Sequence, residues 1–146
     1  RNDIKLVIKD VQETARALAD LDVLCSLALV AYEENYICPT IVMNGQINIR
    51  DGRHPVIEKF LKREVLVPND IVLNHDDEEF LLITGPNMAG KSTYMRQAAI
   101  LMIMAQIGSF IPAREASISP VDRIFTRVGA SDDISTGQST FMVEMK

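Results

Sequence analysis

Hydrophobic positions in the first quarter of the chain recur with the spacing of an α-helix. Small and apolar residues fall three and four positions apart, on one helical face, at Leu18, Leu21, Cys25, Ala28 and Tyr32. We expect one helix from about Asp3 to Asn35, with Asp10 and Glu13 marking an alternative start or kink because they have the spacing of a capping box. Further apolar residues widen the face in the second half, so we expect that half to be buried nearly all round and Cys25 to be a core residue.

The next stretch consists of short β-prone runs separated by turns. Asn44-Gly45 lies between Ile41–Met43 and Gln46–Ile49, and an Asn-Gly pair in this context predicts a β-hairpin. The other elements expected here are a turn at Asp51-Gly52, a short helix over Val56–Lys62, and strands over Val65–Val67 and Ile71–Leu73.

A continuous apolar run, Phe80–Thr84, is typical of a strand that is buried on both faces of a sheet. A helix over Thr93–Ile107 is expected to follow and to end at Gly108, because glycine favours the position after a helix. A further strand is expected over Arg123–Val128. Strand, helix and strand in this order predict an α/β fold.

The segment between that first strand and helix matches the phosphate-binding pattern G-x-x-x-x-G-K-[ST] at each defined position. It reads Gly85-Pro86-Asn87-Met88-Ala89-Gly90-Lys91-Ser92. Glycines let consecutive backbone N–H groups curl around phosphate oxygens, and the following helix directs its positive dipole end at the same anion. Lys91 is expected to reach the β- and γ-phosphates of Mg-ATP, and the Ser92 hydroxyl to ligate Mg²⁺. An ordinary glycine turn is the alternative, but the flanking strand and helix favour nucleotide binding. Asn87 either donates to the γ-phosphate or only tolerates an unusual backbone dihedral.

Composition limits the other functions that the chain could have. It has 146 residues, 47% of them hydrophobic, with 15 basic and 20 acidic side chains and a formal charge of −5. A sizeable core is therefore expected. The acidic balance argues against this segment being the main nucleic-acid-binding surface, because such a surface is normally basic. The two cysteines have no disulfide or metal-site spacing, and the apolar runs are too short to cross a membrane. We expect an intracellular, cytoplasmic protein without a signal peptide.

Nothing after Ser92 resembles the second carboxylate strand of phosphate-loop enzymes, which is an apolar run that ends in Asp or Asp-Glu. The chain also lacks an initiator Met and stops at Lys146, within an apparent helix start. We therefore expect a fragment that by itself binds ATP with little or no turnover.

A second Ser- and Gly-rich segment, Ser135–Thr140, precedes that apparent helix start. Ser139 can be a plain N-cap, which is a common use of serine. Alternatively, it marks a second helix N-terminus directed at a phosphate that a neighbouring subunit supplies. From these residues alone, the N-cap is favoured.

Several long motifs resemble the MutS family of DNA mismatch-repair ATPases. They are Thr84–Thr93, Arg96-Gln97, Gly108–Ala113, Asp122–Asp133 and Ser139–Met145, with Leu21–Leu24, Gly52–Val56 and Val67–Asp70 upstream. The resemblance covers nearly the whole chain without a large gap, and these motifs are far more specific than a phosphate loop alone. Ala89, where many relatives have glycine, is a minor departure.

The resemblance implies an α/β P-loop NTPase domain of the ABC-ATPase type, a partial sheet with flanking helices, preceded by a long α-helix. Residues 1–36 would be the end of a lever helix, and residues 37–146 the N-terminal part of the ATPase domain, truncated before the Walker B motif. The ligands implied are ATP and Mg²⁺. The cofactor-binding residues implied are Gly85, Pro86, Asn87, Met88, Ala89, Gly90, Lys91, Ser92 and Thr93 around the phosphates, with Leu66, Val67 and Asn69 around the adenine. Lys91 and Ser139 would be catalytic, with Ser139 acting in trans on the nucleotide of the other subunit, and Ser92 would hold the metal.

MutS proteins are dimers that bind mismatched double-stranded DNA, so the resemblance implies a homodimer, DNA bound by regions outside this segment, and a MutL-type partner. The setting implied is the bacterial cytoplasm, in association with the nucleoid. ATP binding and hydrolysis in the full-length dimer would be coupled to the DNA clamp. Two alternatives remain, namely a different ABC-type machine such as a chromosome-organising or transport ATPase, and a nucleotide-binding module without catalysis. An apolar run ending in Asp-Glu in the next stretch of the gene would distinguish them.

Overall fold

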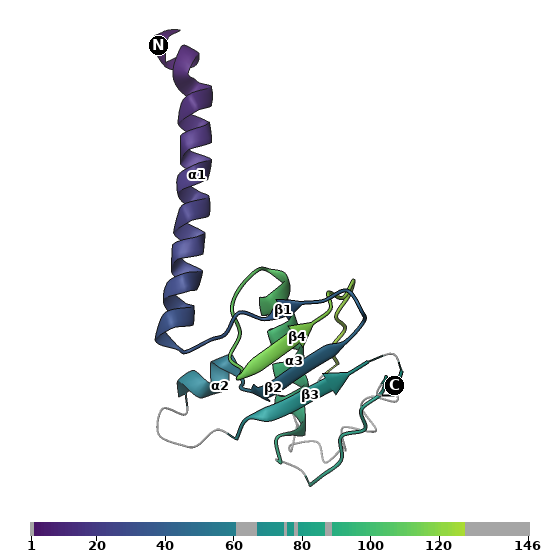
Figure 1. The fold of residues 1–146 in the computed structure, drawn as a ribbon. Coiled ribbons are helices and arrows are strands. Elements are labelled where there is room, and N and C mark those ends of the chain that lie inside the picture. Colours follow the sequence, from purple (N-terminus) through teal and green to yellow (C-terminus); the bar gives the residue numbers. More distant parts are fainter. Residues whose placement is uncertain (1, 61–66, 75, 78, 87–88, 128–146) are drawn as a thin grey trace, which may run out of the picture.

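The computed structural model describes residues 2–60, 67–74, 76–77, 79–86 and 89–127, and consists of a long helix that leads into a small mixed α/β body (Figure 1). Its elements are α1 (Asn2–Glu33), β1 (Thr40–Ile41), β2 (Ile47–Gly52), α2 (Pro55–Phe60), β3 (Asn69–Leu73), α3 (Lys91–Gln106) and β4 (Glu115–Ile118). The mixed α/β class and the leading helix are as expected. The boundary expected between residues 36 and 37 stays a prediction.

Helix α1 runs without interruption from Asn2 to Glu33, so the alternative start at Asp10 is wrong. Its end is set by Asn35, whose positive φ of 53° is the left-handed conformation common just after a helix. The Tyr36 N–H then donates to the Ala31 carbonyl at 2.9 Å. Within the part of the chain that the structure describes, no helix has the length and apolar character needed to cross a membrane.

The expectation that the second half of α1 is buried is wrong in this chain. Leu21 and Leu24 are 57% and 64% exposed, and Cys25 is exposed rather than a core residue. The physical reason is that α1 extends away from the sheet and only its last turns meet the body (Figure 1). There, Leu27 and Ala31 line an apolar hollow together with Phe110.

The four strands form one sheet in the order β1-β4-β2-β3. Strand β4 lies between β1 and β2, parallel to the first and antiparallel to the second, so the hairpin expected around Asn44-Gly45 does not form. The chain does turn there, with Gly45 at a φ of 75°. The turn separates β1 from β2 widely enough for β4 to enter, as the hydrogen bonds from Val42 N to Ile118 O and from Ser119 N to Gln46 O show.

Strands β2 and β3 pair in antiparallel fashion, with an irregularity between Ile49 and Gly52. The turn expected at Asp51-Gly52 is this irregularity, in which Asp51 has a φ of 49°. Gly52 fits where a larger residue would not, because an added Cβ would lie 3.0 Å from Gln97 Nε2 and 3.1 Å from the Asn69 carbonyl oxygen. Helix α3 therefore approaches the sheet closely at this point.

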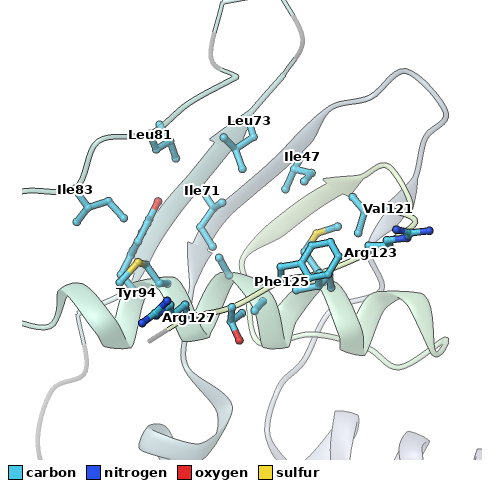
Figure 2. A pocket seen from close by; sticks show the side chains of 16 residues that line it. Ile47, Ile71, Leu73, Leu81, Ile83, Tyr94, Val121, Arg123, Phe125 and Arg127 are labelled. Atoms are coloured by element: carbon cyan, nitrogen blue, oxygen red, sulfur yellow. The ribbon is translucent and has the colours of Figure 1, made fainter. Parts of the chain in front are cut away.

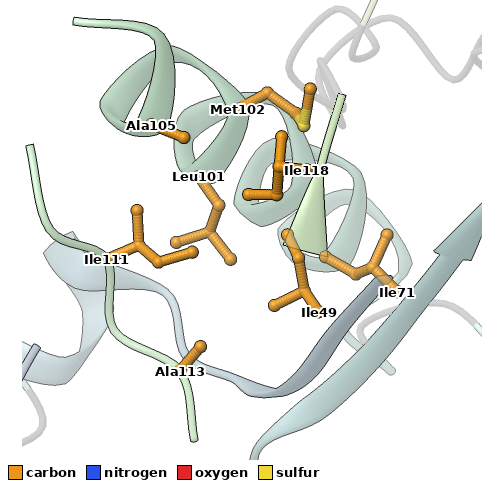
Figure 3. Packing of buried hydrophobic residues seen from close by; sticks show 8 residues of the cluster. All are labelled: Ile49, Ile71, Leu101, Met102, Ala105, Ile111, Ala113 and Ile118. Atoms are coloured by element: carbon orange, nitrogen blue, oxygen red, sulfur yellow. The ribbon is translucent and has the colours of Figure 1, made fainter. Parts of the chain in front are cut away.

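Helix α3 covers one face of the sheet and shares the core with it (Figure 3). The buried cluster comprises Ile49, Ile71, Leu101, Met102, Ala105, Ile111, Ala113 and Ile118. The helix begins at Lys91 and ends at Gln106, and Gly108 follows at a φ of 83°, which agrees with the helix end expected from that glycine. The core therefore fixes α3, and with it Lys91, relative to the sheet.

Two expected strands are not strands in the described residues. Phe80–Thr84 runs without strand pairing and Phe80 is 81% exposed, while residues 123–127 are also unpaired. A doubly buried strand needs neighbours on both sides, and the described residues supply none here. Leu81 and Ile83 instead line an apolar hollow together with Ile71 and Tyr94 (Figure 2). Of the other short elements, β3 covers Ile71–Leu73, and α2 (Pro55–Phe60) begins one residue earlier than expected. The expected end of that helix at Lys62, and the first two residues of the strand expected over Val65–Val67, lie outside the described residues.

Candidate nucleotide-binding site

The two defined glycines of the phosphate loop have backbone conformations that favour glycine. Gly85 has a φ of +152° and Gly90 a φ of +90°, both on the positive side that L-residues rarely adopt. An added Cβ at Gly90 would meet nothing within 4 Å, so the requirement for glycine there comes from the backbone dihedral rather than from lack of space. Gly90 is the N-cap of α3, and its carbonyl accepts from the Tyr94 N–H at 2.9 Å.

The N-terminus of α3 offers donors to an anion. The first N–H groups of an α-helix have no acceptor within the helix, and they carry its positive dipole end. The first turn of α3, all of which the structure describes, contains no acidic residue that would repel an anion. Ser92 is exposed in this turn and Thr93 is half-buried, so the Ser92 hydroxyl is accessible beside the N–H groups.

Lys91 is half-buried and folds back over the loop. Its Nζ donates to the carbonyl oxygens of Gly85 and Pro86, the latter at 3.0 Å. The loop also contains a long hydrogen bond of 3.4 Å from Ala89 N to Pro86 O. The structure thus brings the ammonium group, the glycines and the start of α3 together.

Of the other candidate residues, Val67 and Asn69 belong to the described part of the chain. Val67 is 70% exposed, and Asn69 Nδ2 donates to the Val67 carbonyl at 3.1 Å. The remaining candidates lie outside the described residues, and they are Leu66, Asn87, Met88 and Ser139.

Two side chains of α3, whose roles the sequence motifs did not reveal, connect this helix to the strands. The Tyr94 hydroxyl donates to the Asp70 carbonyl at 2.8 Å, and Gln97 Nε2 donates to the Gly52 carbonyl at 2.9 Å. Gln97 is only 2% exposed although it is polar. The sequence offered the Arg96-Gln97 motif at this point, but that motif does not indicate a contact with the strands. The start of β3, next to Asn69, is therefore tied to the helix that begins at the phosphate loop.

Asp70 is itself held by neighbours from β2. Its carboxylate accepts from the Asp51 N–H at 2.9 Å and from Arg50 Nη1 at 2.8 Å. The Asp51 hydrogen bond, followed by that from Arg50, lowers the pKa of Asp70 below its ordinary value. The carboxylate therefore stays ionised at neutral pH and keeps both donors.

His54 is a buried residue directly before Pro55, at the start of α2. The side chain is 5% exposed, and its Nδ1 accepts from the Ile57 N–H at 3.4 Å at the start of α2. Burial, assisted by the positive charge of Arg96, lowers the pKa of His54. The neutral imidazole is thus the form that the fold prefers.

Lowering the pH from about 7.5 to about 5.5 is expected to destabilise the 146-residue chain through His54. The unfolded chain binds a proton at its ordinary pKa of 6.5, whereas the folded chain does so only at a lower pH. The contribution of neutral His54 to stability is therefore complete above pH 6.5, and it is lost as the pH falls from 6.5 toward the lowered pKa of His54 in the folded chain. Urea unfolding at the two pH values measures this change. His54→Asn should reduce this pH dependence, and an undiminished dependence in that variant would contradict the assignment.

The described residues contain no group of three or more His, Cys, Asp or Glu side chains that could hold a metal by themselves. The Ser92 hydroxyl is the metal ligand that the sequence predicts, and this role stays a prediction. Mg²⁺ commonly binds in this way, with one or two protein groups, substrate phosphates and waters.

Comparison with known proteins points to one family. Residues 81–146 match the family model for MutS domain V. The chain is 59% identical over 145 residues, or 99% of its length, to the DNA mismatch repair protein MutS of Acetivibrio thermocellus, and 65% identical over 135 residues, or 92% of its length, to that of Syntrophomonas wolfei. It spans 17% and 16% of the length of these relatives.

Proposed function

Because this chain belongs to the MutS family, as a segment that includes domain V, we propose that it is the ATP-binding part of a DNA mismatch repair protein. The observation that carries the proposal is the arrangement of Lys91, the left-handed Gly90 and the exposed start of α3. A P-loop domain of the ABC-ATPase type is the architecture that we assign to it.

The α and β phosphates would lie against the backbone N–H groups between Gly85 and Thr93, where the helix dipole favours negative charge. A chain with a Cβ at Gly90 would have to give up the left-handed turn that begins α3. The Lys91 ammonium, which lies over the loop, would exchange its carbonyl partners for β- and γ-phosphate oxygens. Such charge-assisted hydrogen bonds are about twice as strong as neutral ones.

The residues present also fit Mg²⁺. The Ser92 hydroxyl is accessible one residue after Lys91, and phosphate oxygens would supply further ligands. When bound, the ion would neutralise phosphate charge during transfer to water. Leu66, Val67 and Asn69 are proposed to contact the adenine, with exposed Val67 offering an apolar surface to the base.

Titration of the protein with a fluorescent ATP analogue in the presence of Mg²⁺ tests the proposal. Saturable binding that unlabelled ATP displaces is expected. Binding that ATP does not displace would contradict it.

We further propose that two such domains hydrolyse ATP together in the full-length dimer. Asn87 would contact the γ-phosphate in cis, and Ser139 would reach the γ-phosphate held by the other subunit. Mismatched DNA would be bound by other regions, with α1 as the connection to them and a MutL-type protein as a further partner. ATP can drive such a cycle only if it binds the closed arrangement of the two domains more tightly than the open one.

Ser139→Ala is expected to lower ATP hydrolysis by the full-length dimer about ten-fold and to leave ATP affinity unchanged. The reason is that a donor in trans is lost while the phosphate loop in cis stays intact. Steady-state phosphate release and nucleotide titration measure the two quantities. Ser135→Ala, in the same segment, is the control and should change neither. If ATP affinity fell as much as hydrolysis, Ser139 would instead act on the nucleotide of its own subunit or stabilise the fold.

A further inference from the structure

Tyr94 connects the phosphate loop helix to the start of strand β3. It stands in the first turn of α3, three residues after Lys91, and its hydroxyl donates to the Asp70 carbonyl at 2.8 Å. Figure 2 shows its ring rising from α3 toward the sheet, with the oxygen at the far end. Asp70 directly follows Asn69, so this bond joins the helix to the segment that contains Val67 and Asn69.

We propose that Tyr94 is a positioning residue that fixes the base-contacting segment 67–69 at a set distance from the phosphate loop. It would thereby make the site select a nucleoside triphosphate over a bare polyphosphate chain. This inference rests on the proposed function, since it requires that phosphates bind at the start of α3 and that a base binds near Val67.

The acceptor of this hydrogen bond belongs to a residue that is also anchored on its other side. The Asp70 carboxylate is held by Arg50 Nη1 and by the Asp51 N–H, so β2 fixes one side of the residue and Tyr94 the other. Burial, followed by the negative charge of Asp70, raises the pKa of Tyr94 above its ordinary value. The phenol therefore remains protonated and keeps its donor role.

A second contact keeps α3 in place independently of Tyr94. Gln97, one turn later on the same face, donates to the Gly52 carbonyl, and Gly52 in turn lies against the Asn69 carbonyl. Leu101, one further turn along α3, packs in the buried cluster with residues of β2, β3 and β4. Removing the Tyr94 hydroxyl would thus free the Asn69–Asp70 end of β3 from α3, so that only β2 still holds it, while α3 and the phosphate loop keep their position. The variant should therefore lose affinity through weaker contacts with the base, while its contacts with the phosphates stay the same.

The test compares Mg-ATP with Mg-tripolyphosphate as ligands of the full-length protein, each measured by displacement of a fluorescent ATP analogue. Tyr94→Phe, which removes one oxygen atom, is expected to weaken ATP binding about five-fold, as the loss of one hydrogen bond implies, and to change tripolyphosphate binding less than about two-fold. Tyr32→Phe is the matched control, because the Tyr32 ring is 84% exposed on α1. This substitution should leave the affinity for both ligands unchanged.

The ratio of the two dissociation constants decides the outcome, because an unfolded fraction of the variant lowers the binding capacity for both ligands alike. Equal weakening of both ligands would overturn the inference, and so would unchanged ATP affinity. If the unsubstituted protein binds ATP no more tightly than tripolyphosphate, the positioning role is wrong while the phosphate site stands. If it binds neither ligand, the proposed function itself is wrong.

Discussion

Replacing Lys91 with alanine is expected to weaken ATP binding at least about 100-fold, because the change removes charge-assisted hydrogen bonds worth about 1.5–3 kcal/mol each. The side chain already lies over the loop, with Nζ near the Gly85 and Pro86 carbonyls, so it needs little rearrangement to meet a phosphate. Titration with a fluorescent ATP analogue measures the loss.

The control for this substitution is Lys9→Ala, which removes the same charge from an exposed position on α1, where Lys9 pairs only loosely with Glu13 at 3.8 Å. Its ATP affinity should match that of the unsubstituted protein. Lys91→Arg should not restore binding fully, because a planar guanidinium differs in shape and donor geometry from a compact ammonium group. Unchanged ATP affinity in Lys91→Ala would rule out the phosphate loop as the binding site.

Leu101→Ala is expected to lower the free energy of unfolding of the 146-residue chain by about 2–5 kcal/mol. Leu101 is fully buried on α3, among Ile49, Ile111 and Ile118 from the strands and the loop that it faces. Removing three carbon atoms there loses transfer free energy and leaves a cavity that the sheet and helix fill only in part. Urea unfolding followed by circular dichroism measures the change.

Ile103→Ala provides the comparison on the same helix, since Ile103 is 49% exposed. It should cost less than about 1 kcal/mol, because a half-exposed side chain loses less contact and leaves no closed cavity. An equal effect of the two substitutions would mean that α3 does not pack on the sheet through Leu101. Together, the pair tests the packing that holds the phosphate loop in place.

The parts of the fold that local sequence determines were predictable. The limits of α1 and α3 follow from helical periodicity and from the residues after their ends, Asn35 and Gly108. The phosphate loop was recognisable because it requires particular residue types at fixed spacing. Gly90 and Lys91 accordingly lie where the pattern places them.

The pairing of strands was not predictable in the same way. Asn44-Gly45 does turn the chain, but local sequence contains no information about β4, which arrives from about 70 residues later and separates β1 from β2. An Asn-Gly pair indicates where the chain reverses, but tertiary packing decides which strands pair with one another. The same holds for Phe80–Thr84, whose apolar character predicts burial between strands that the described residues do not include.

The residues of the candidate site likewise differ in whether the sequence predicted them. Lys91 and Ser92 follow from a motif, whereas the contacts of Tyr94 and Gln97 join α3 to residues 24 and 45 positions away in sequence. Gln97 belongs to the Arg96-Gln97 motif of the resemblance, but that motif does not indicate its contact, and tyrosine and glutamine are ordinary residues in an amphipathic helix. Only the fold shows that their polar ends reach backbone carbonyls of the sheet.

The long first helix has a mechanical consequence that its sequence does not suggest. Thirty-two residues at about 1.5 Å each make a rod of about 48 Å. Its base is held by polar contacts, among them the ion pair of Lys59 with Glu34 at 3.0 Å and a 3.4 Å hydrogen bond from Arg53 to the Glu34 carbonyl. Partly exposed pairs of this kind resist bending weakly. A tilt of about 5° at the base would carry the opposite end through about 4 Å, so small displacements at the base become large ones at the tip.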